Sequence, residues 1–338
     1  MNIKTSVIIA GMLCHGFRLT RWLCVIAGVW TLQVSSGLAQ GGGPPRRLDD
    51  PQTMSLSSGS RIEFREFYAN SLGREIRYSI LLPPSYETDS SRTYPVVYFL
   101  HGLFNDDTSW AVDRYGSLPP QIEQMMVEKR VPEFLMVHPQ GQNSFYTDSA
   151  DGTRPFEKYL GEDLIREIES NFRAKRDRKN RAIGGTSMGG FGALKLAMKH
   201  PDLFSSVLAG SPIVILGDDP TVYWSDQSNR FSQHLAGLFA GVFGDPFDRE
   251  HWKRNSLENL ARTSNLGDMR ILMIYGTADR YNERIPIEKG VRALEEILSN
   301  RGVDAELKIY EGEPHGWNLI EKHLDESILF LTETFGKN

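Results

Sequence analysis

The segment Gly185-Thr186-Ser187-Met188-Gly189 places one serine between glycines in a G-x-S-x-G pattern. This pattern is typical of a nucleophile elbow, a tight strand-to-helix turn that exposes the serine hydroxyl. A hydroxyl is a weak nucleophile at neutral pH, so it needs a base within hydrogen-bonding reach and a carboxylate that orients the base. Glycine-rich turns are also common without a catalytic role, so the motif gains weight only from the elements around it.

A histidine and an aspartate after Ser187 lie where a catalytic triad needs them. His315 directly follows a predicted strand in a turn-rich loop, whereas His200 is expected at the C-terminal end of a helix, where the dipole favours it. Asp279 follows another predicted strand, while Asp268 precedes that strand and would lie at the opposite edge of the sheet. The order serine, acid, histidine is that of α/β-hydrolases. A surface-loop histidine and a turn-forming aspartate are the alternatives.

Two backbone amides are expected to complete this site by stabilising a negatively charged oxygen. One is the N–H of Met188, the residue after the nucleophile, and the other is the N–H of Leu103, in the loop after the strand of PVVYFLHG. His101 of the same loop is expected to shape the loop rather than to act as a base. Nucleophile, oxyanion loop, acid and base thus all have candidates at the ends of predicted strands.

Apolar runs of the buried-strand type alternate with helix-like segments along the chain. The predicted strands are 95–100, 133–138, 181–185, 204–210, 269–276 and 305–312, and the predicted helices are 118–129, 159–172, 189–199, 286–299 and a C-terminal one from residue 320. This alternation predicts an α/β fold with a doubly wound, mostly parallel sheet. Period-two patterns on both sides of Ser71-Leu72-Gly73 predict an antiparallel pair at its N-terminal edge. Residues 213–267 break the rhythm and are expected to form a cap-like insertion of loops and short helices, whose aromatic residues line a pocket or form local core.

The first 39 residues have the order of basic, apolar and small residues that is typical of a secretory signal peptide. An apolar run follows Arg21, and Ala39 is the expected cleavage point, with Met12 as an alternative start. A membrane anchor is the alternative, although the run is shorter than the ~20 residues of a spanning helix. The expected organisation is a signal peptide at 1–39, a flexible lead-in at 40–60 and a catalytic domain at 61–338. A periplasmic or secreted location follows from this interpretation.

The charge balance and the positions of the cysteines limit which partners and which disulfides are expected for the mature chain. The chain has 38 basic and 43 acidic residues, and the leader contains three of the basic ones, so the mature chain would carry 35 basic residues and a net charge of −8. Such a surface is a poor partner for nucleic acid, and no membrane partner is expected after removal of the leader. Both cysteines lie in the leader, so no disulfide is expected in the mature chain.

Several segments together resemble the putative-esterase family of α/β-hydrolases, which includes esterase D, feruloyl and acetyl-xylan esterases and the mycolyltransferases. They are LLPPSY, YPVVYFLHG, QNSFYTDSADG, IGGTSMGGFGALKLAMKHPDLFSS, YGTADRY and EPHGW, and the resemblance covers about residues 61–335. It implies the α/β-hydrolase fold, a Ser187, Asp279 and His315 triad, and oxyanion amides at Leu103 and Met188. It also implies that the loop with Asn143 and Tyr146 borders the substrate, the alternative being a plain surface turn.

The sequence therefore predicts a secreted or periplasmic serine carboxylic-ester hydrolase that forms an acyl-enzyme on Ser187. No metal and no cofactor are expected, because this chemistry needs none and no metal-ligand spacing occurs. An acyltransferase that moves the acyl group to a sugar hydroxyl is the alternative within enzymes. A non-catalytic, carbohydrate-binding protein on a hydrolase scaffold is the alternative outside them.

Overall fold

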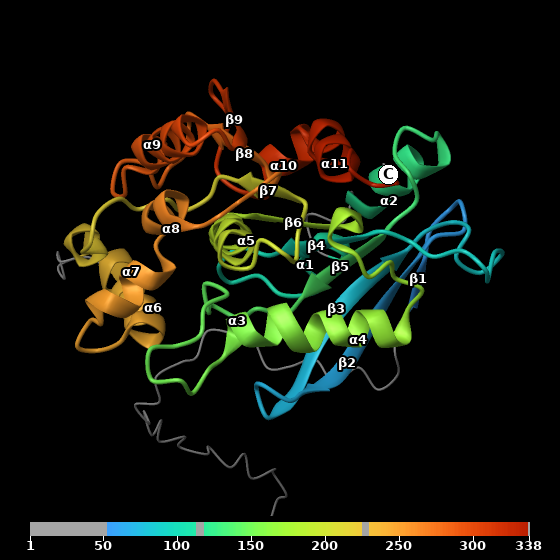
Figure 1. The fold of residues 1–338 in the computed structure, drawn as a ribbon, viewed down its shortest axis with the longest axis horizontal. Helices are drawn as coiled ribbons and strands as arrows, with labels where there is room; N and C mark the ends of the chain where they lie inside the picture. The colour runs from blue at the N-terminus through green and yellow to red at the C-terminus, as the bar shows by residue number, and fades with distance from the viewer. Residues whose placement is uncertain (1–52, 113–117, 225–229, 337–338) are drawn as a thin grey trace, which may run out of the picture. The chain divides into compact units, whose positions relative to one another are not determined.

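The computed structural model describes residues 53–112, 118–224 and 230–336, and within them nine strands form one sheet (Figure 1). The predicted signal peptide lies outside these residues and stays a prediction. The order across the sheet is β1-β2-β3-β5-β4-β6-β7-β8-β9. The strands are β1 (Thr53–Ser55), β2 (Arg61–Ala69), β3 (Arg74–Leu82), β4 (Val96–Leu100), β5 (Leu135–Pro139), β6 (Arg181–Thr186), β7 (Ser206–Gly210), β8 (Arg270–Gly276) and β9 (Asp304–Tyr310).

The strand directions confirm the predicted sheet. β2 and β3 form an antiparallel hairpin in which Arg74 pairs with Ala69 across the Ser71-Leu72-Gly73 turn, and β3 is also antiparallel to β5. All pairs from β5 through β4 to β9 are parallel. In a sheet of this kind functional groups gather at the carboxyl ends of the strands. The loops after β4, β5, β6, β8 and β9 therefore meet at one edge.

The two faces of the sheet carry separate hydrophobic cores. In β4, Val96, Tyr98 and Leu100 face one core and Val97 and Phe99 face the other, as the alternation of a strand requires. The first core is covered by α4 (Ile165–Asn171), α5 (Met188–Lys199), α8 (Leu257–Thr263) and α9 (Ile287–Asn300), and the second by α1 (Ser109–Val112), α2 (Leu118–Val127), α10 (Trp317–Lys322) and α11 (Leu324–Thr332). Both faces are buried, which explains why the parallel strands read as continuous apolar runs.

Two helices predicted as single units are built from several pieces. The helix expected at 159–172 begins as α3 (Phe156–Lys158), passes through a π-helical turn at Tyr159–Leu164 and continues as α4, which crosses β2 and β3 in Figure 1. Tyr78 of β3 donates a hydrogen bond to Glu167 of α4 (3.0 Å). The C-terminal helix is two helices, because the backbone leaves the helical conformation at His323.

Of the expected lead-in at 40–60, only residues 53–60 lie within the described part of the chain, and these residues pack against the domain. Residues 53–55 form β1, which pairs with β2, and Ser60 is buried. The backbone N–H groups of Ser58 (3.2 Å) and Ser60 (2.9 Å) donate to the carboxylate of Glu123 in α2. This carboxylate takes the place of water as their partner, so a composition rich in Ser and Gly is compatible with an ordered segment here.

The insertion at 213–267 is more helical than predicted. It contains a 3₁₀ turn (Pro220–Trp224), α6 (Arg230–Phe243), α7 (Arg249–Asn255) and α8. The rings of Phe239, Phe243 and Trp252 are buried and pack against one another, with centroids 5.1 to 6.2 Å apart, so these aromatic residues form local core. Across the described ranges, no helix is both long and apolar enough to span a membrane.

Candidate active site

Ser187 lies at the turn between β6 and α5, in a backbone conformation that few residues adopt. Its φ is 58° and its ψ is −118°, and its N–H donates to the Gly210 carbonyl (2.8 Å) at the end of β7. The glycines on either side are sterically required. A Cβ on Gly189 would lie 2.1 Å from the Leu100 carbonyl oxygen, and one on Gly185 would lie 2.5 Å from the Gly189 backbone. The glycines of the motif thus allow the close backbone approach that a strained nucleophile elbow needs.

The loops after β8 and β9 bring Asp279 and His315 to this serine. His315 Nε2 lies 2.8 Å from Ser187 Oγ, and His315 Nδ1 lies 2.6 Å from Asp279 Oδ2. Because a carboxylate only accepts hydrogen bonds, Nδ1 carries the ring proton and Nε2 is left to accept the serine proton. The side chains of Asp279 and His315 are 0% and 9% exposed, so little water competes for these contacts. The three residues are therefore arranged as a nucleophile, a base and an orienting acid.

Tyr281, which the sequence analysis missed, supports both partners of the serine. Its backbone N–H donates to Asp279 Oδ1 (2.9 Å), so the two carboxylate oxygens have separate partners. Its ring meets the His315 ring edge to face, with centroids 4.7 Å apart and an interplanar angle of 79°. The signal was present in YGTADRYN, since an aspartate that begins a turn often accepts from the N–H two residues later.

His200 and Asp268, which the sequence does not favour as base or acid, and a further histidine of the insertion lie away from this group. His200 ends α5, as predicted, and its Nε2 lies 3.1 Å from Glu157. Asp268 precedes β8 and pairs with Arg178 (2.7 Å). His251 of the insertion contacts the Asp148 carbonyl through Nε2 (2.9 Å). None of these three side chains contacts Ser187.

The residues predicted to supply oxyanion amides lie beside the nucleophile. Met188 is the first residue of α5, and N–H groups in the first turn of a helix have no partner within the helix. A Cβ built on Gly102 would lie 3.4 Å from Ser187 Cβ, so the next peptide, which carries the Leu103 N–H, runs past the serine. The placement is compatible with two amides that converge on a substrate oxygen, and their catalytic role stays a prediction.

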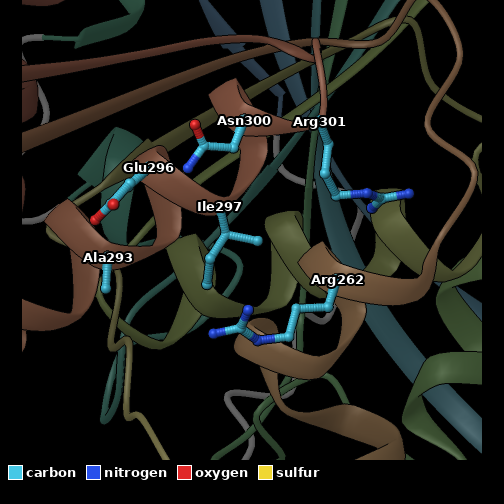
Figure 2. Close-up of a pocket in the computed structure, with 6 residues that line it drawn as sticks. All are labelled: Arg262, Ala293, Glu296, Ile297, Asn300 and Arg301. Atoms are coloured by element: carbon cyan, nitrogen blue, oxygen red, sulfur yellow. The ribbon is translucent and has the colours of Figure 1, made fainter.

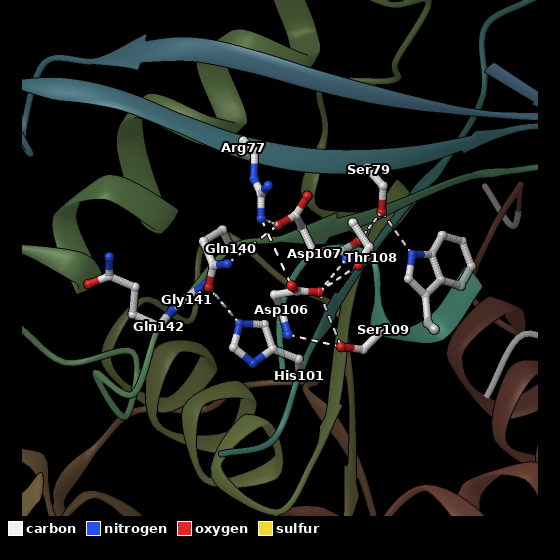
Figure 3. Close-up of polar contacts among 11 residues, drawn as sticks. Arg77, Ser79, His101, Asp106, Asp107, Thr108, Ser109, Gln140, Gly141 and Gln142 are labelled. Carbon is white, nitrogen blue, oxygen red and sulfur yellow. Dashed lines mark hydrogen bonds and ion pairs between the residues drawn. The ribbon is translucent and has the colours of Figure 1, made fainter. Parts of the chain in front are cut away.

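His101 fixes the orientation of that peptide. Its Nδ1 lies 2.8 Å from the Gly102 carbonyl oxygen. Its Nε2 accepts a hydrogen bond from the Gly141 N–H (2.9 Å; Figure 3). The ring is therefore the neutral Nδ1–H tautomer, and burial lowers its pKa accordingly. The Gly102 carbonyl and the Leu103 N–H belong to one planar peptide group. By fixing the Gly102 carbonyl, His101 therefore also fixes the direction of the Leu103 N–H. This is the loop-shaping role expected of His101.

A buried polar network lies behind the oxyanion loop (Figure 3). Asp107 has no exposed surface, and its Oδ1 accepts from Arg77 (2.9 Å) and from Gln140 Nε2 (3.4 Å). Burial raises the pKa of Asp107 to about 6, although the Arg77 charge opposes this shift. Ser79 Oγ donates to the Asp107 carbonyl and accepts from Trp110 Nε1 (2.8 Å). The network ties the loop after β4 to β3 and to the end of β5.

The two residues predicted to border the substrate have different positions. Asn143 is half-buried, and its Oδ1 accepts from the Phe104 N–H (2.9 Å). Tyr146 is a correction: its side chain is fully buried, and its hydroxyl donates to the His101 carbonyl (2.8 Å). A Cβ on Gly141 or Gly192 would lie 2.2 or 2.4 Å from its ring, so glycines make the room for it. Tyr146 supports the oxyanion loop from below and has no surface that a substrate can touch.

A surface pocket on α8 and α9 does not belong to this site. Figure 2 shows its lining, which consists of Arg262, Ala293, Glu296, Ile297, Asn300 and Arg301. Arg301 donates from its guanidinium to the carbonyls of Ala261 and Ser264 (the latter at 2.7 Å), near the end of α8. This pocket contains no triad residue, and its charged lining is explained by the helix end that Arg301 caps.

Comparison with known proteins places this geometry in a family. Residues 69–331 match the family described as "Putative esterase". An esterase of Mycobacterium tuberculosis is 31% identical over 261 residues, and the match covers 73% of this chain and 54% of that protein. The chain thus spans about half the length of this relative. An acetyl esterase of Caldicellulosiruptor saccharolyticus is 24% identical, with 79% of this chain and 96% of the relative covered.

Solved structures share the fold. A ferulic acid esterase superposes with a TM-score of 0.66 at 22% identity and covers 82% of this chain and 99% of its own. An S-formylglutathione hydrolase from Agrobacterium tumefaciens gives a TM-score of 0.65 at 21% identity, with 84% and 99% covered. These likenesses show the α/β-hydrolase fold. Together with the match over residues 69–331, they establish that the chain belongs to the putative-esterase family of α/β-hydrolases.

Proposed function

We propose that the protein is a serine carboxylic-ester hydrolase that works through an acyl-enzyme on Ser187. The observation that carries this proposal is the pair of contacts from His315, at 2.8 Å to Ser187 Oγ and 2.6 Å to Asp279 Oδ2. This is the arrangement in which a histidine removes a serine proton while a carboxylate stabilises the imidazolium that forms. The esterase relatives support the same reaction class.

In the first half of the reaction, Ser187 Oγ attacks the ester carbonyl carbon as His315 Nε2 takes its proton. The carbonyl oxygen becomes negatively charged and accepts hydrogen bonds from the N–H groups of Leu103 and Met188. His315 then gives the proton to the leaving alcohol, and the acyl group stays on Ser187. The orienting carboxylate of Asp279 keeps the ring in the tautomer that this exchange needs.

In the second half, a water molecule replaces the alcohol. His315 Nε2 takes one proton of the water, the resulting hydroxide attacks the acyl carbon, and the same two amides hold the oxygen. Collapse of the intermediate releases the carboxylic acid, and His315 returns the proton to Ser187 Oγ. The complete cycle converts an ester and one water molecule into an alcohol and a carboxylic acid, and none of its steps uses a metal or a cofactor.

The relatives suggest which substrates to test, and the leader-like segment suggests where the enzyme works. An endo-1,4-beta-xylanase/feruloyl esterase of Xylanibacter ruminicola and the acetyl esterase above are similar to this chain, so we include acyl groups of both sizes, on small alcohols and on sugars. We also propose export from the cytoplasm on the basis of the leader-like residues 1–39. N-terminal sequencing of protein from the native host tests export: a mature chain that starts near Gln40 supports it, and retention of residues 1–30 contradicts it.

The reaction is tested by labelling and hydrolysis in parallel. The purified protein is treated with a fluorophosphonate probe and assayed on nitrophenyl esters of increasing chain length, feruloyl esters and acetylated sugars. We expect labelling at Ser187, hydrolysis of at least one ester class, and the loss of both in Ser187→Ala. Absence of labelling and of hydrolysis in the parent protein would refute the proposal and favour a binding role for the fold.

A further inference from the structure

We propose that Phe104 and His234 form a platform that binds a ring of the ester substrate beside the oxyanion hole. The proposal rests on the proposed esterase function and adds the structural class of its substrate. Phe104 is 58% exposed, one of the few large apolar side chains among the described residues with so much surface in water. It follows Leu103 directly, so its Cα is at most about 4 Å from the Cα of the residue that carries the predicted oxyanion amide.

The backbone at Phe104 is held in an unfavourable conformation. Its φ is 64°, in the left-handed region that bulky residues rarely adopt. The Phe104 N–H donates to Asn143 Oδ1 (2.9 Å), and this bond joins the oxyanion loop to the loop after β5. Strain of this kind persists where the surroundings enforce it and is concentrated at functional sites. The structure thus holds an exposed apolar ring, on a strained backbone, next to the predicted oxyanion amide.

The insertion supplies the second half of the platform. His234, on α6, is also exposed, and its ring centroid lies 5.2 Å from that of Phe104 with an interplanar angle of 34°. The two rings come from segments 130 residues apart in the chain, so the pair forms only in the folded protein. α6 is anchored beneath by Phe239, which packs on Phe145 of the loop after β5 (4.7 Å). This anchor fixes where the His234 ring stands.

The chemistry of this surface selects flat ligands. Two adjacent rings offer π faces and apolar edges, to which another aromatic ring binds by stacking and the C–H face of a pyranose binds by apolar contact. A short aliphatic group gains little from such a surface, since it covers only part of one ring. The ring can belong to an aromatic acyl group or to a sugar alcohol, and the experiment separates these sources.

The test compares two pairs of esters, each with one member that carries a ring and one that does not. Methyl cinnamate is paired with methyl crotonate, which has the same conjugated acyl group without the phenyl ring, and an acetylated methyl xyloside is paired with ethyl acetate. kcat/KM is measured for the parent, for Phe104→Leu, which stays apolar but lacks a ring, and for Phe104→Tyr, which keeps it. Tyr68→Leu is the control, because Tyr68 is 55% exposed but lies on β2 in the antiparallel part of the sheet.

We expect Phe104→Leu to lower the ring-to-aliphatic ratio of kcat/KM about fivefold, mainly through KM, in one of the two pairs, which identifies the source of the ring. Phe104→Tyr and Tyr68→Leu should keep the parental ratio. An unchanged ratio in Phe104→Leu, or an equal loss on all four esters, would overturn the platform and leave the esterase function intact. A parent protein that hydrolyses none of the four and resists the fluorophosphonate probe would overturn both.

Discussion

The hydrogen bond that His315 Nδ1 donates to Asp279 acts by fixing the tautomer of the imidazole ring. In Asp279→Asn, the amide N–H can donate to Nδ1, which favours the tautomer that carries its proton on Nε2. The amide oxygen, in the other orientation, is a weaker acceptor than the carboxylate. We therefore expect kcat to fall about 10³- to 10⁴-fold in Asp279→Asn and at least as much in Ser187→Ala. The double variant should lose little more than Ser187→Ala alone, because the triad acts as a unit.

Steady-state kinetics on one nitrophenyl ester checks both single variants and the double variant, with far-UV circular dichroism to confirm folding. An Asp279→Asn protein with parental turnover would mean that another carboxylate orients His315. A Ser187→Ala protein with parental turnover would remove the serine mechanism altogether.

Gly102 tests the oxyanion loop, where the acting groups are backbone amides. A Cβ at this position would already touch Ser187 Cβ at 3.4 Å, so the two methyl groups of valine would crowd the serine and turn the Leu103 amide. Loss of one oxyanion donor costs about 10²–10³ in turnover, and we expect Gly102→Val to lose that much. Leu103→Met, which keeps the backbone, should stay within about tenfold of the parent. A folded Gly102→Val protein with the parental rate would place the oxyanion hole elsewhere.

At the scale of elements, the junction of β6 and α5 determines how closely the start of α5, next to Ser187, packs against the sheet. Gly189→Ala would place a methyl group 2.1 Å from the Leu100 carbonyl of β4, and the helix would have to move away from that strand. We expect a loss of about 3 kcal/mol or more in the free energy of unfolding, together with slow probe labelling. Gly237→Ala on the exposed face of α6, where a Cβ meets nothing within 4 Å, should instead gain about 0.5–1 kcal/mol. Urea unfolding measures both, and similar values for the two variants would contradict this account of the junction.

The strands and the triad could be predicted because their signals are local. A buried parallel strand such as β8 is a continuous apolar run, and Asp279 follows it within three residues, so placement follows from position alone. β1 and the serine-rich segment before Ser60 could not be predicted, since the backbone of that segment is held by Glu123, 63 residues after Ser60 in the chain. The burial of Tyr146 was missed for the same reason: Gly192, which makes room for its ring, lies on another element.

At the scale of the whole molecule, Asp107 makes stability depend on pH. Its pKa is raised from 3.8 to about 6 in the folded state, so the folded protein binds more protons than the unfolded chain between these values. The contribution of this group to the free energy of unfolding is therefore largest below pH 4 and falls as pH rises through 4 to 6, by about 3 kcal/mol in total.

Asp107→Asn isolates this contribution, because the amide does not titrate and can still accept from Arg77. The difference in unfolding free energy between Asp107→Asn and the parent should grow in favour of the variant as pH increases from 4 to 6.5 and then level off. Urea unfolding across this range measures it. A difference that stays constant with pH would show that Asp107 titrates normally in the folded state.

The outermost position of β9 has a consequence for how the enzyme loses activity. β9 pairs with β8 alone and is only half-buried, yet the loop that follows it carries His315, while Ser187 follows β6, an inner strand that pairs with β4 and β7. Regions with one neighbour and partial burial open locally at lower free energy than the core of a domain. Fraying of this edge would separate the base from a nucleophile that is still in place, so heat inactivation would precede the melting of the sheet and would reverse on cooling.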